Sequence, residues 1–135
     1  MKLGVCVPYR NREKHLHEFI PKVGKFLKER NIEFCMYFGH QCDDKLFNRG
    51  AMKNIGFMAM MDKYKNNYED ITFVFNDVDC LPYTKNIIDY KTQRGIIKHF
   101  YGFKHLLGGM LSITGLSLIH ISEPTRQAEI SYAVF

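Results

Sequence analysis

Two aspartates at the end of an apolar run are the residues of this chain best suited to chemistry. Residues 71–80 read ITFVFNDVDC, so Asp77 and Asp79 directly follow β-branched and aromatic residues that are typical of a strand buried on both faces. Carboxylates held at a strand end suit a hard divalent cation, and such a cation suits a phosphate-bearing substrate. The pattern Asp-x-Asp is also compatible with an Asp-rich turn, so its interpretation depends on the residues upstream.

Arginines follow the two earlier apolar runs of the chain. The segment PYRNR comes directly after residues 3–7, and FNR, ending at Arg49, follows residues 33–38 after a loop that includes Gln41. Guanidinium groups beside a helix N-terminus offer paired donors to phosphate oxygens, and an aromatic ring there could stack on a base. Each segment alone could be a solvated loop. Three successive strand ends with arginine, arginine and an acid pair predict an anion-binding edge.

The elements expected to position these residues alternate between strand and helix. Strands are predicted at residues 3–7, 33–38, 71–75, 96–100 and 110–113, and helices at 13–29 and 47–64. Asn11 is a candidate cap of the first helix, and Pro21 predicts a kink or a break in it. The core face of the second helix is predicted to comprise Ala51, Ile55, Met58, Ala59 and either Met60 or Met61. This order favours an α/β fold with a mostly parallel sheet flanked by helices and a nucleotide-binding topology.

The end of the chain does not fit this pattern. Residues 116–135 (LSLIHISEPTRQAEISYAVF) match a translation of the mosaic-end repeat of a transposase sequencing-library adapter, and residues 130–135 match its flow-cell end. The alternative is a natural but unusual tail, interrupted by Pro124. We therefore expect a partial domain at residues 1–115, truncated at its C-terminus, and a non-native tail at 116–135 that packs poorly.

Composition excludes several other classes of protein. A formal net charge of +5 is compatible with a small anionic ligand, and it falls short of the basic clusters that nucleic-acid binding requires. No apolar stretch reaches the length of a membrane span, and no signal peptide is recognisable, so a soluble chain is expected. The four cysteines lack metal-finger spacing and are expected to be free thiols.

Three motifs, in this order and spacing, resemble the amino-terminal half of the β-1,4-galactosyltransferase family: PYRNREKHL, FNRGAMKNIGF and FVFNDVDCLP. The resemblance covers roughly Leu3 to Thr114. It implies a GT-A-like fold and inverting transfer from a UDP-sugar donor to a carbohydrate acceptor with manganese. By this likeness the donor-binding residues are Pro8, Tyr9, Arg10, Arg12, Phe47, Arg49, Asp77, Val78, Asp79, Gly108 and Gly109.

The resemblance also assigns roles and exposes departures. Asp79 would be the metal ligand, Gly108 and Gly109 would approach the donor sugar, and Tyr9 replaces the Phe common in the family. Family members carry a Trp-Gly-rich loop leading to Glu-Asp-Asp, which supplies the catalytic base, and a later His that ligates the metal. This chain has no Trp. We therefore expect a donor-binding fragment that is inactive in transfer. The alternative is a non-catalytic nucleotide- or phosphate-binding α/β module. Eukaryotic members of the family are Golgi lumenal, and the location of this chain stays open.

Overall fold

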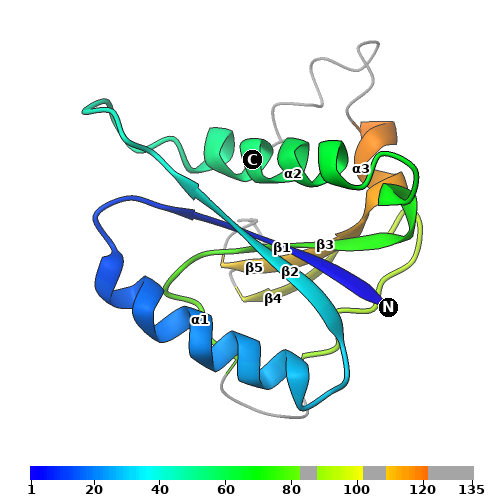
Figure 1. The fold of residues 1–135 in the computed structure, drawn as a ribbon. Coiled ribbons are helices and arrows are strands. Elements are labelled where there is room, and N and C mark those ends of the chain that lie inside the picture. Colours follow the sequence, from blue (N-terminus) through cyan, green and yellow to red (C-terminus); the bar gives the residue numbers. More distant parts are fainter. Residues whose placement is uncertain (83–87, 102–108, 122–135) are drawn as a thin grey trace.

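The computed structural model describes residues 1–82, 88–101 and 109–121, which form a sheet with helices on both faces (Figure 1). The elements are β1 (Lys2–Tyr9), α1 (Glu13–Lys28), β2 (Glu33–His40), α2 (Arg49–Lys63), the short 3-10 helix η1 (Tyr68–Asp70), β3 (Ile71–Asn76), β4 (Lys98–Tyr101), β5 (Met110–Thr114) and α3 (Gly115–Ile121). Each predicted strand and helix is therefore present, with ends that agree or differ by at most two residues.

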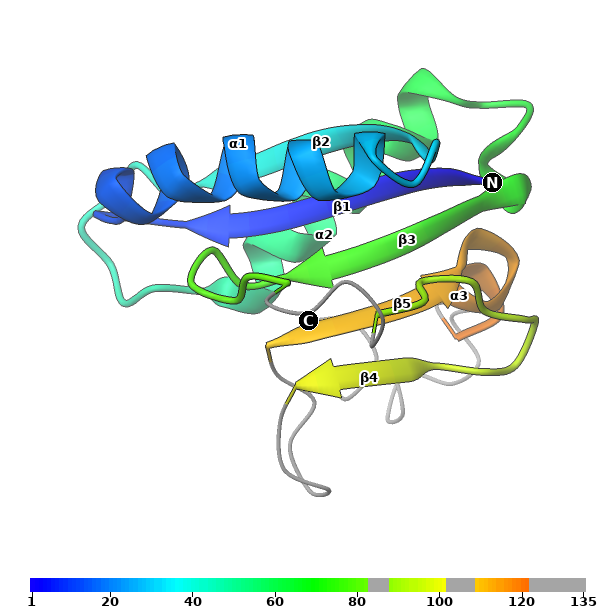
Figure 2. The same ribbon diagram turned by 90° about the horizontal axis from the view of Figure 1, so that it is seen from below.

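The sheet is mixed, with strand order β2-β1-β3-β5-β4 (Figure 2). Strand β1 pairs in parallel with β2 and β3, while β5 pairs antiparallel with β3 and β4. Within the part of the chain that the structure describes, β5 is thus the strand that runs against the others. The prediction of an α/β fold with a mostly parallel sheet is confirmed. The carboxyl ends of β1, β2 and β3 meet at one edge.

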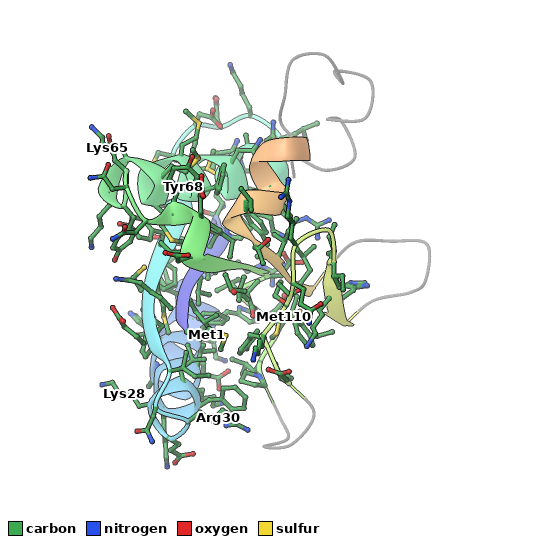
Figure 3. The ribbon with its side chains drawn as sticks, turned by 90° about the vertical axis from the view of Figure 1, so that its right-hand side faces the viewer. Met1, Lys28, Arg30, Lys65, Tyr68 and Met110 are labelled. Carbon is green, nitrogen blue, oxygen red and sulfur yellow. The ribbon has the colours of Figure 1, made fainter. Side chains whose placement is uncertain are left out.

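The two helices cover opposite faces of this sheet, so the central strands are buried on both sides. Figure 3 shows the sheet between α1, whose end is marked by Lys28, and the turn after α2, marked by Lys65 and Tyr68. On the α1 side, Leu3, Val5 and Val7 of β1 pack into one apolar cluster. On the α2 side, buried residues from β3, α2 and β5 form a second cluster, including Phe73, Phe75, Met60 and Leu111. This double coverage explains why β1 and β3 have nearly continuous apolar sequences.

Helix α1 packs an apolar stripe on the sheet and differs from expectation at its start and at its proline. Phe19, Val23, Phe26 and Leu27, which recur at helical spacing, are buried, whereas Ile20 is 42% exposed. The helix continues across Pro21, so the predicted break is wrong. Pro21 has no N–H to donate to the carbonyl of His17, four residues earlier in the helix. Both residues are exposed, so water can satisfy that carbonyl.

The predicted cap of α1 is also wrong. The residue that precedes the helix is Arg12, without a side-chain capping bond, and Asn11 has φ of 51°. That angle lies in the left-handed region, which asparagine tolerates better than most residues. Asn11 therefore turns the chain from β1 into the helix instead of capping it.

Helix α2 presents a different face to the core than its apolar periodicity predicts. Its buried residues are Lys53, Gly56 and Met60, whereas Ile55 and Met58 are 53% and 65% exposed. Ala51 is half-buried and Ala59 is exposed, so only Met60 among the predicted core residues is confirmed as buried. The cause is a close approach of α2 to β1: a Cβ on Gly56 would lie 3.3 Å from the Cβ and the Sγ of Cys6.

A second close approach occurs at Gly39 in β2 and gives a stability prediction. An added Cβ there would lie 2.5 Å from the carbonyl oxygen of Met52 in α2, and a helix backbone atom cannot move aside as a side chain could. We expect Gly39→Ala to lower the free energy of unfolding by about 1–3 kcal/mol, measured by urea denaturation. Gly24→Ala in α1 is the matched control, because the nearest atom to its added Cβ is a Phe34 ring carbon at 4.0 Å.

The control should stabilise the protein by about 0.5–1 kcal/mol, since glycine disfavours a helix interior. Similar losses in both variants would show that the Gly39 contact does not position α2.

The segment after Gly115 packs more closely on the rest of the chain than the sequence predicts. Residues 115–121 form α3, in which Leu118 is 7% exposed and joins the cluster around Phe73. The hydroxyl of Ser117 accepts a hydrogen bond from the Gly95 amide at 2.8 Å. The expectation of poor packing is therefore wrong for residues 116–118, while residues 122–135 lie outside the described residues. The adapter origin of the tail stays a prediction.

Candidate functional site

A cleft of about 680 Å³ opens at the edge of the sheet where β1 and β3 end. It is lined by Pro8, Tyr9, Arg10, Asn11, Arg12, Phe47, Arg49, Asp77, Val78 and Asp79. Nine of the eleven residues predicted for the site thus line one cleft. Of the other two, Gly109 is hydrogen-bonded to Asp77, and Gly108 lies outside the described residues.

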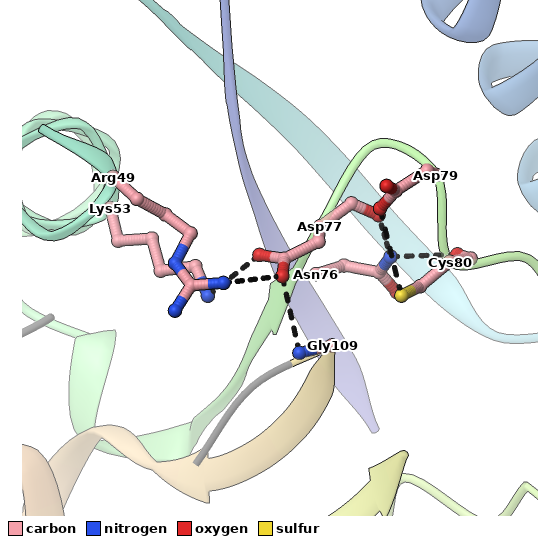
Figure 4. Close-up of polar contacts among 7 residues, drawn as sticks. All are labelled: Arg49, Lys53, Asn76, Asp77, Asp79, Cys80 and Gly109. Carbon is pink, nitrogen blue, oxygen red and sulfur yellow. Dashed lines mark hydrogen bonds and ion pairs between the residues drawn. The ribbon is translucent and has the colours of Figure 1, made fainter. Parts of the chain in front are cut away.

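The carboxylate of Asp77 is directed inward and is held on both of its oxygens (Figure 4). Its Oδ2 accepts hydrogen bonds from Arg49 Nη1 at 2.9 Å and from the Gly109 amide at 3.2 Å. Its Oδ1 forms an ion pair with Lys53 Nζ at 3.0 Å. The Asp77 amide also donates to the Gly109 carbonyl at 2.7 Å. This clamp fixes the end of β3 to α2 and to the start of β5.

Lys53 is the clamp residue that sequence reasoning missed. Its side chain is 2% exposed, and burial lowers the pKa of its ammonium group, an effect that the Asp77 carboxylate opposes. A lysine in an otherwise apolar part of α2 could have been noticed. It follows Arg49 by four residues, and that spacing places both cations on one face of the helix.

Asp79 has a different environment from Asp77, although only one residue separates them. It is exposed, and it makes no ion pair with any of the described residues; the Cys80 thiol lies 3.8 Å from its Oδ1. The turn that carries Asp79 is held by the side chain of Asn76. Its Nδ2 donates to the backbone carbonyls of Asp77 at 2.7 Å and of Cys80 at 2.8 Å. Asp79 is therefore a carboxylate presented to the cleft on a rigid turn.

Arg10 lines the cleft and also holds the loop between β2 and α2, and its role as a phosphate donor stays a prediction. Its Nη1 donates to the carbonyls of Lys45 and, at 3.4 Å, of Asp43. Its guanidinium lies 5.9 Å from the centre of the Phe47 ring. Arg12, in contrast, is exposed on the cleft wall. In this arrangement Arg12 and Arg49 are the cations with exposed side chains, while Arg10 shapes the wall.

The same loop is organised by Gln41, another residue whose role the sequence did not indicate. Gln41 is 6% exposed; its Nε2 donates to Asp43 Oδ1 at 2.6 Å and to the Leu46 carbonyl at 3.1 Å. Its Oε1 accepts from the Asn48 amide at 2.7 Å. Asn48 in turn caps α2 by accepting from the Ala51 amide at 2.9 Å. These bonds define the wall from which Phe47 and Arg49 project.

The cysteines are free thiols, as predicted, and none of the described ones completes a metal centre. Cys6 is buried, and burial raises the pKa of its thiol. Burial and the neighbouring Asp79 and Asp77 carboxylates raise the pKa of Cys80 to about 11, so it remains a thiol at neutral pH. The described residues contain no cluster of three or more His, Cys, Asp or Glu side chains that could hold a metal ion.

A divalent cation at this cleft would therefore need donors from a ligand. Asp79 offers one hard oxygen donor, which fits manganese or magnesium when phosphate oxygens supply further positions. The donor chemistry at the cleft is thus compatible with a cation that binds together with a diphosphate.

Comparison with known proteins decides the family. A model of the N-terminal region of glycosyl transferase group 7 matches residues 1–92. The chain belongs to this family. Two relatives of this group 7 chain are a Caenorhabditis elegans xylosylprotein 4-β-galactosyltransferase, 33% identical over 84% of the chain, and human β-1,4-galactosyltransferase 4, 33% identical over 60%. The resemblance to β-1,4-galactosyltransferases is confirmed.

Solved structures show the same fold. A Drosophila β-1,4-galactosyltransferase 7 mutant in complex with manganese, UDP-Gal and xylobiose matches 89% of this group 7 chain with a TM-score of 0.74 and 25% identity. The Drosophila catalytic domain in complex with xylobiose gives a TM-score of 0.73 at 26% identity. The prediction of a GT-A-like fold is confirmed.

The group 7 chain spans only part of these proteins. It covers 40% of the nematode relative, 22% of the human relative and 51% of each Drosophila structure. No helix in the described residues is long and apolar enough to cross a membrane.

Proposed function

We propose that the cleft binds the nucleoside diphosphate part of a UDP-sugar, as the donor half of a β-1,4-galactosyltransferase-like enzyme that transfers a hexose to a carbohydrate acceptor with inversion. The observation that supports this most is the separation of roles between two adjacent carboxylates. Asp77 is held by two cations and a backbone amide, whereas Asp79 is exposed in the same cleft as Arg12 and Arg49. The Drosophila neighbour solved with manganese and UDP-Gal supports the same ligand class.

The charges around the cleft suit the departure of a diphosphate. Negative charge develops on the leaving group during transfer, and guanidinium groups of Arg12 and Arg49 would stabilise it without any proton transfer. Manganese, when bound through Asp79, would supply Lewis-acid stabilisation of the same charge. Phe47 would stack on the base, and the Gly109 backbone would allow close approach of the donor sugar.

We infer further that residues 1–115 bind the donor without transferring it. Inversion requires a base on the face of the sugar opposite the leaving group. The Trp-Gly-rich and Glu-Asp-Asp segments that supply this base in the family do not occur in this sequence. Turnover of UDP-galactose by the chain should therefore stay at background, and turnover clearly above background would contradict this inference.

Nucleotide binding tests the proposal through Arg49. We expect the chain to bind UDP more tightly than uridine in titration calorimetry with manganese present. Arg49→Lys should weaken UDP binding by about tenfold, because an ammonium cannot reproduce the paired donors of a guanidinium, and should leave uridine binding nearly unchanged.

Arg30→Lys is the matched control, because Arg30 lies over the Phe26 ring at the end of α1, away from the cleft. It should change neither affinity. Failure of the unaltered chain to bind UDP would refute the proposed function. Phosphate binding without preference for UDP over pyrophosphate would favour the non-catalytic phosphate-binding module.

A further inference from the structure

The buried cation Lys53 lies next to the cleft without lining it. Its side chain is 2% exposed, while that of Arg49, one helical turn earlier, is 49% exposed and lines the cleft. Both cations contact the same carboxylate, that of Asp77, which is 16% exposed. The arrangement therefore gives one acid two cationic partners, of which only Arg49 faces a ligand.

The two cations use different oxygens of Asp77. Lys53 pairs with Oδ1, whereas Arg49 and the Gly109 amide share Oδ2 (Figure 4). If Arg49 turned away, Oδ1 would keep its ion pair and Oδ2 would keep the Gly109 hydrogen bond. Departure of Arg49 would thus leave the carboxylate still balanced and still bonded.

We propose that Lys53 is a positioning residue that balances the charge of Asp77, so that Arg49 is free to exchange from Asp77 to a phosphate oxygen of the ligand. This inference rests on the proposed function, because the phosphate is that of the nucleotide bound in the cleft. Without Lys53, moving Arg49 to the ligand would uncover a partly buried carboxylate, and that cost would be subtracted from the binding free energy. With Lys53 present, the Asp77 carboxylate stays paired with one ammonium group after Arg49 has moved, so the pair has no net charge.

The spacing of Arg49 and Lys53 on α2 allows one to contact a ligand while the other balances the charge of Asp77. Residues four apart on α2 face the same side, so Arg49 in the first turn reaches the open cleft while Lys53 in the second turn lies under it. A lysine suits the lower position because its single ammonium contacts one oxygen, whereas a guanidinium fork would compete for both.

The test compares UDP and uridine binding in the full chain after Lys53→Met, which keeps the side-chain length and removes the charge. We expect UDP affinity to fall by about tenfold and uridine affinity to change little, because Arg49 is then held by Asp77. Lys65→Met is the matched control: it removes an exposed lysine just after the same helix, paired with Asp62, and should change neither affinity.

A second substitution separates positioning from a structural role. Adding Asp77→Asn to Lys53→Met removes the charge that would retain Arg49, so the ratio of UDP to uridine affinity should recover towards that of the unaltered chain. A role limited to packing would show no such recovery. Lys53→Gln, which removes the charge and keeps a hydrogen-bond donor, serves if circular dichroism shows that the methionine variant does not fold.

The outcomes distinguish the two proposals. An unaltered chain that binds UDP, together with an unchanged affinity ratio after Lys53→Met or Lys53→Gln, would overturn this inference alone. A ratio that stays low in the double variant would also overturn it. An unaltered chain that does not bind UDP would overturn the proposed function and this inference together.

Discussion

Replacing Asp77 by alanine is expected to lower the free energy of unfolding by about 3 kcal/mol, measured by urea denaturation. The carboxylate is 16% exposed and balances Lys53, which is 2% exposed, so its removal leaves a buried ammonium without its counter-charge. It also removes the acceptor of the Gly109 amide, at 3.2 Å, which ties the start of β5 to the end of β3. Removing one partner of a buried ion pair costs more than the pair itself contributes.

The control for this variant is Asp62→Ala on the same helix as Lys53. Asp62 is 78% exposed and pairs with Lys65 at 3.0 Å, so its loss should change stability by less than about 0.5 kcal/mol. A loss below about 1 kcal/mol for Asp77→Ala would show that the clamp contributes little to the fold.

In contrast to Asp77→Ala, Asp79→Ala should change the free energy of unfolding little and should strongly weaken metal-dependent binding. In the unaltered chain we expect manganese to bind weakly alone and more tightly with UDP, because one carboxylate is an incomplete coordination shell. Asp79→Ala should weaken manganese binding in the presence of UDP by more than about tenfold. Calorimetric titration of manganese with and without UDP measures this difference.

Asp89→Ala provides the matched control, because Asp89 is an exposed carboxylate paired with Lys98 at 3.1 Å outside the cleft. It should leave the effect of UDP on manganese affinity intact. Equal manganese affinity in the Asp79 variant and the unaltered chain would remove Asp79 as the ligand.

The parts of the site that could be predicted are the residues that directly follow a predicted strand. A run such as ITFVFN identifies a buried strand, and the residues that follow it must emerge at the edge of the sheet. Parallel pairing of β1 with β2 and β3 then brings Tyr9, Arg49 and Asp77 to one edge. For this reason the strand-end pattern predicts that Arg49 and Asp77 share one edge, although they come from separate segments. The remaining lining residues, such as Val78, are implied by the family resemblance and not by the pattern.

The parts that could not be predicted depend on how closely two backbones approach. The periodicity of α2 offers two faces, and the one with Ile55 and Met58 is the more apolar. The helix instead packs through Gly56 against β1 and against Gly39 of β2, where an added Cβ would lie 2.5 Å from the Met52 carbonyl oxygen. Burial of Lys53 follows from this choice and from the position of Asp77, neither of which a helical pattern contains.

The sequence also did not predict the hydrogen bonds that join one loop to another. The motif PYRNR predicts a phosphate ligand at Arg10, and it does not indicate that the Nη1 of Arg10 also bonds carbonyls of the loop that follows β2. Gln41 is an ordinary loop residue in sequence and yet bonds Asp43, Leu46 and Asn48. Such partners are selected by the tertiary arrangement, which brings β1 beside this loop.

The late position of β5 in the chain has a consequence for the order in which the protein assembles. Strands β2 and β3 both pair with β1, and all three belong to the first part of the chain to be synthesised. The clamp on Asp77 also requires the amide of Gly109, which is 32 residues later. A nascent chain therefore acquires its sheet edge before its finished cleft, and ligand-binding competence should be one of the last properties gained on the ribosome, after β5 has inserted beside β3.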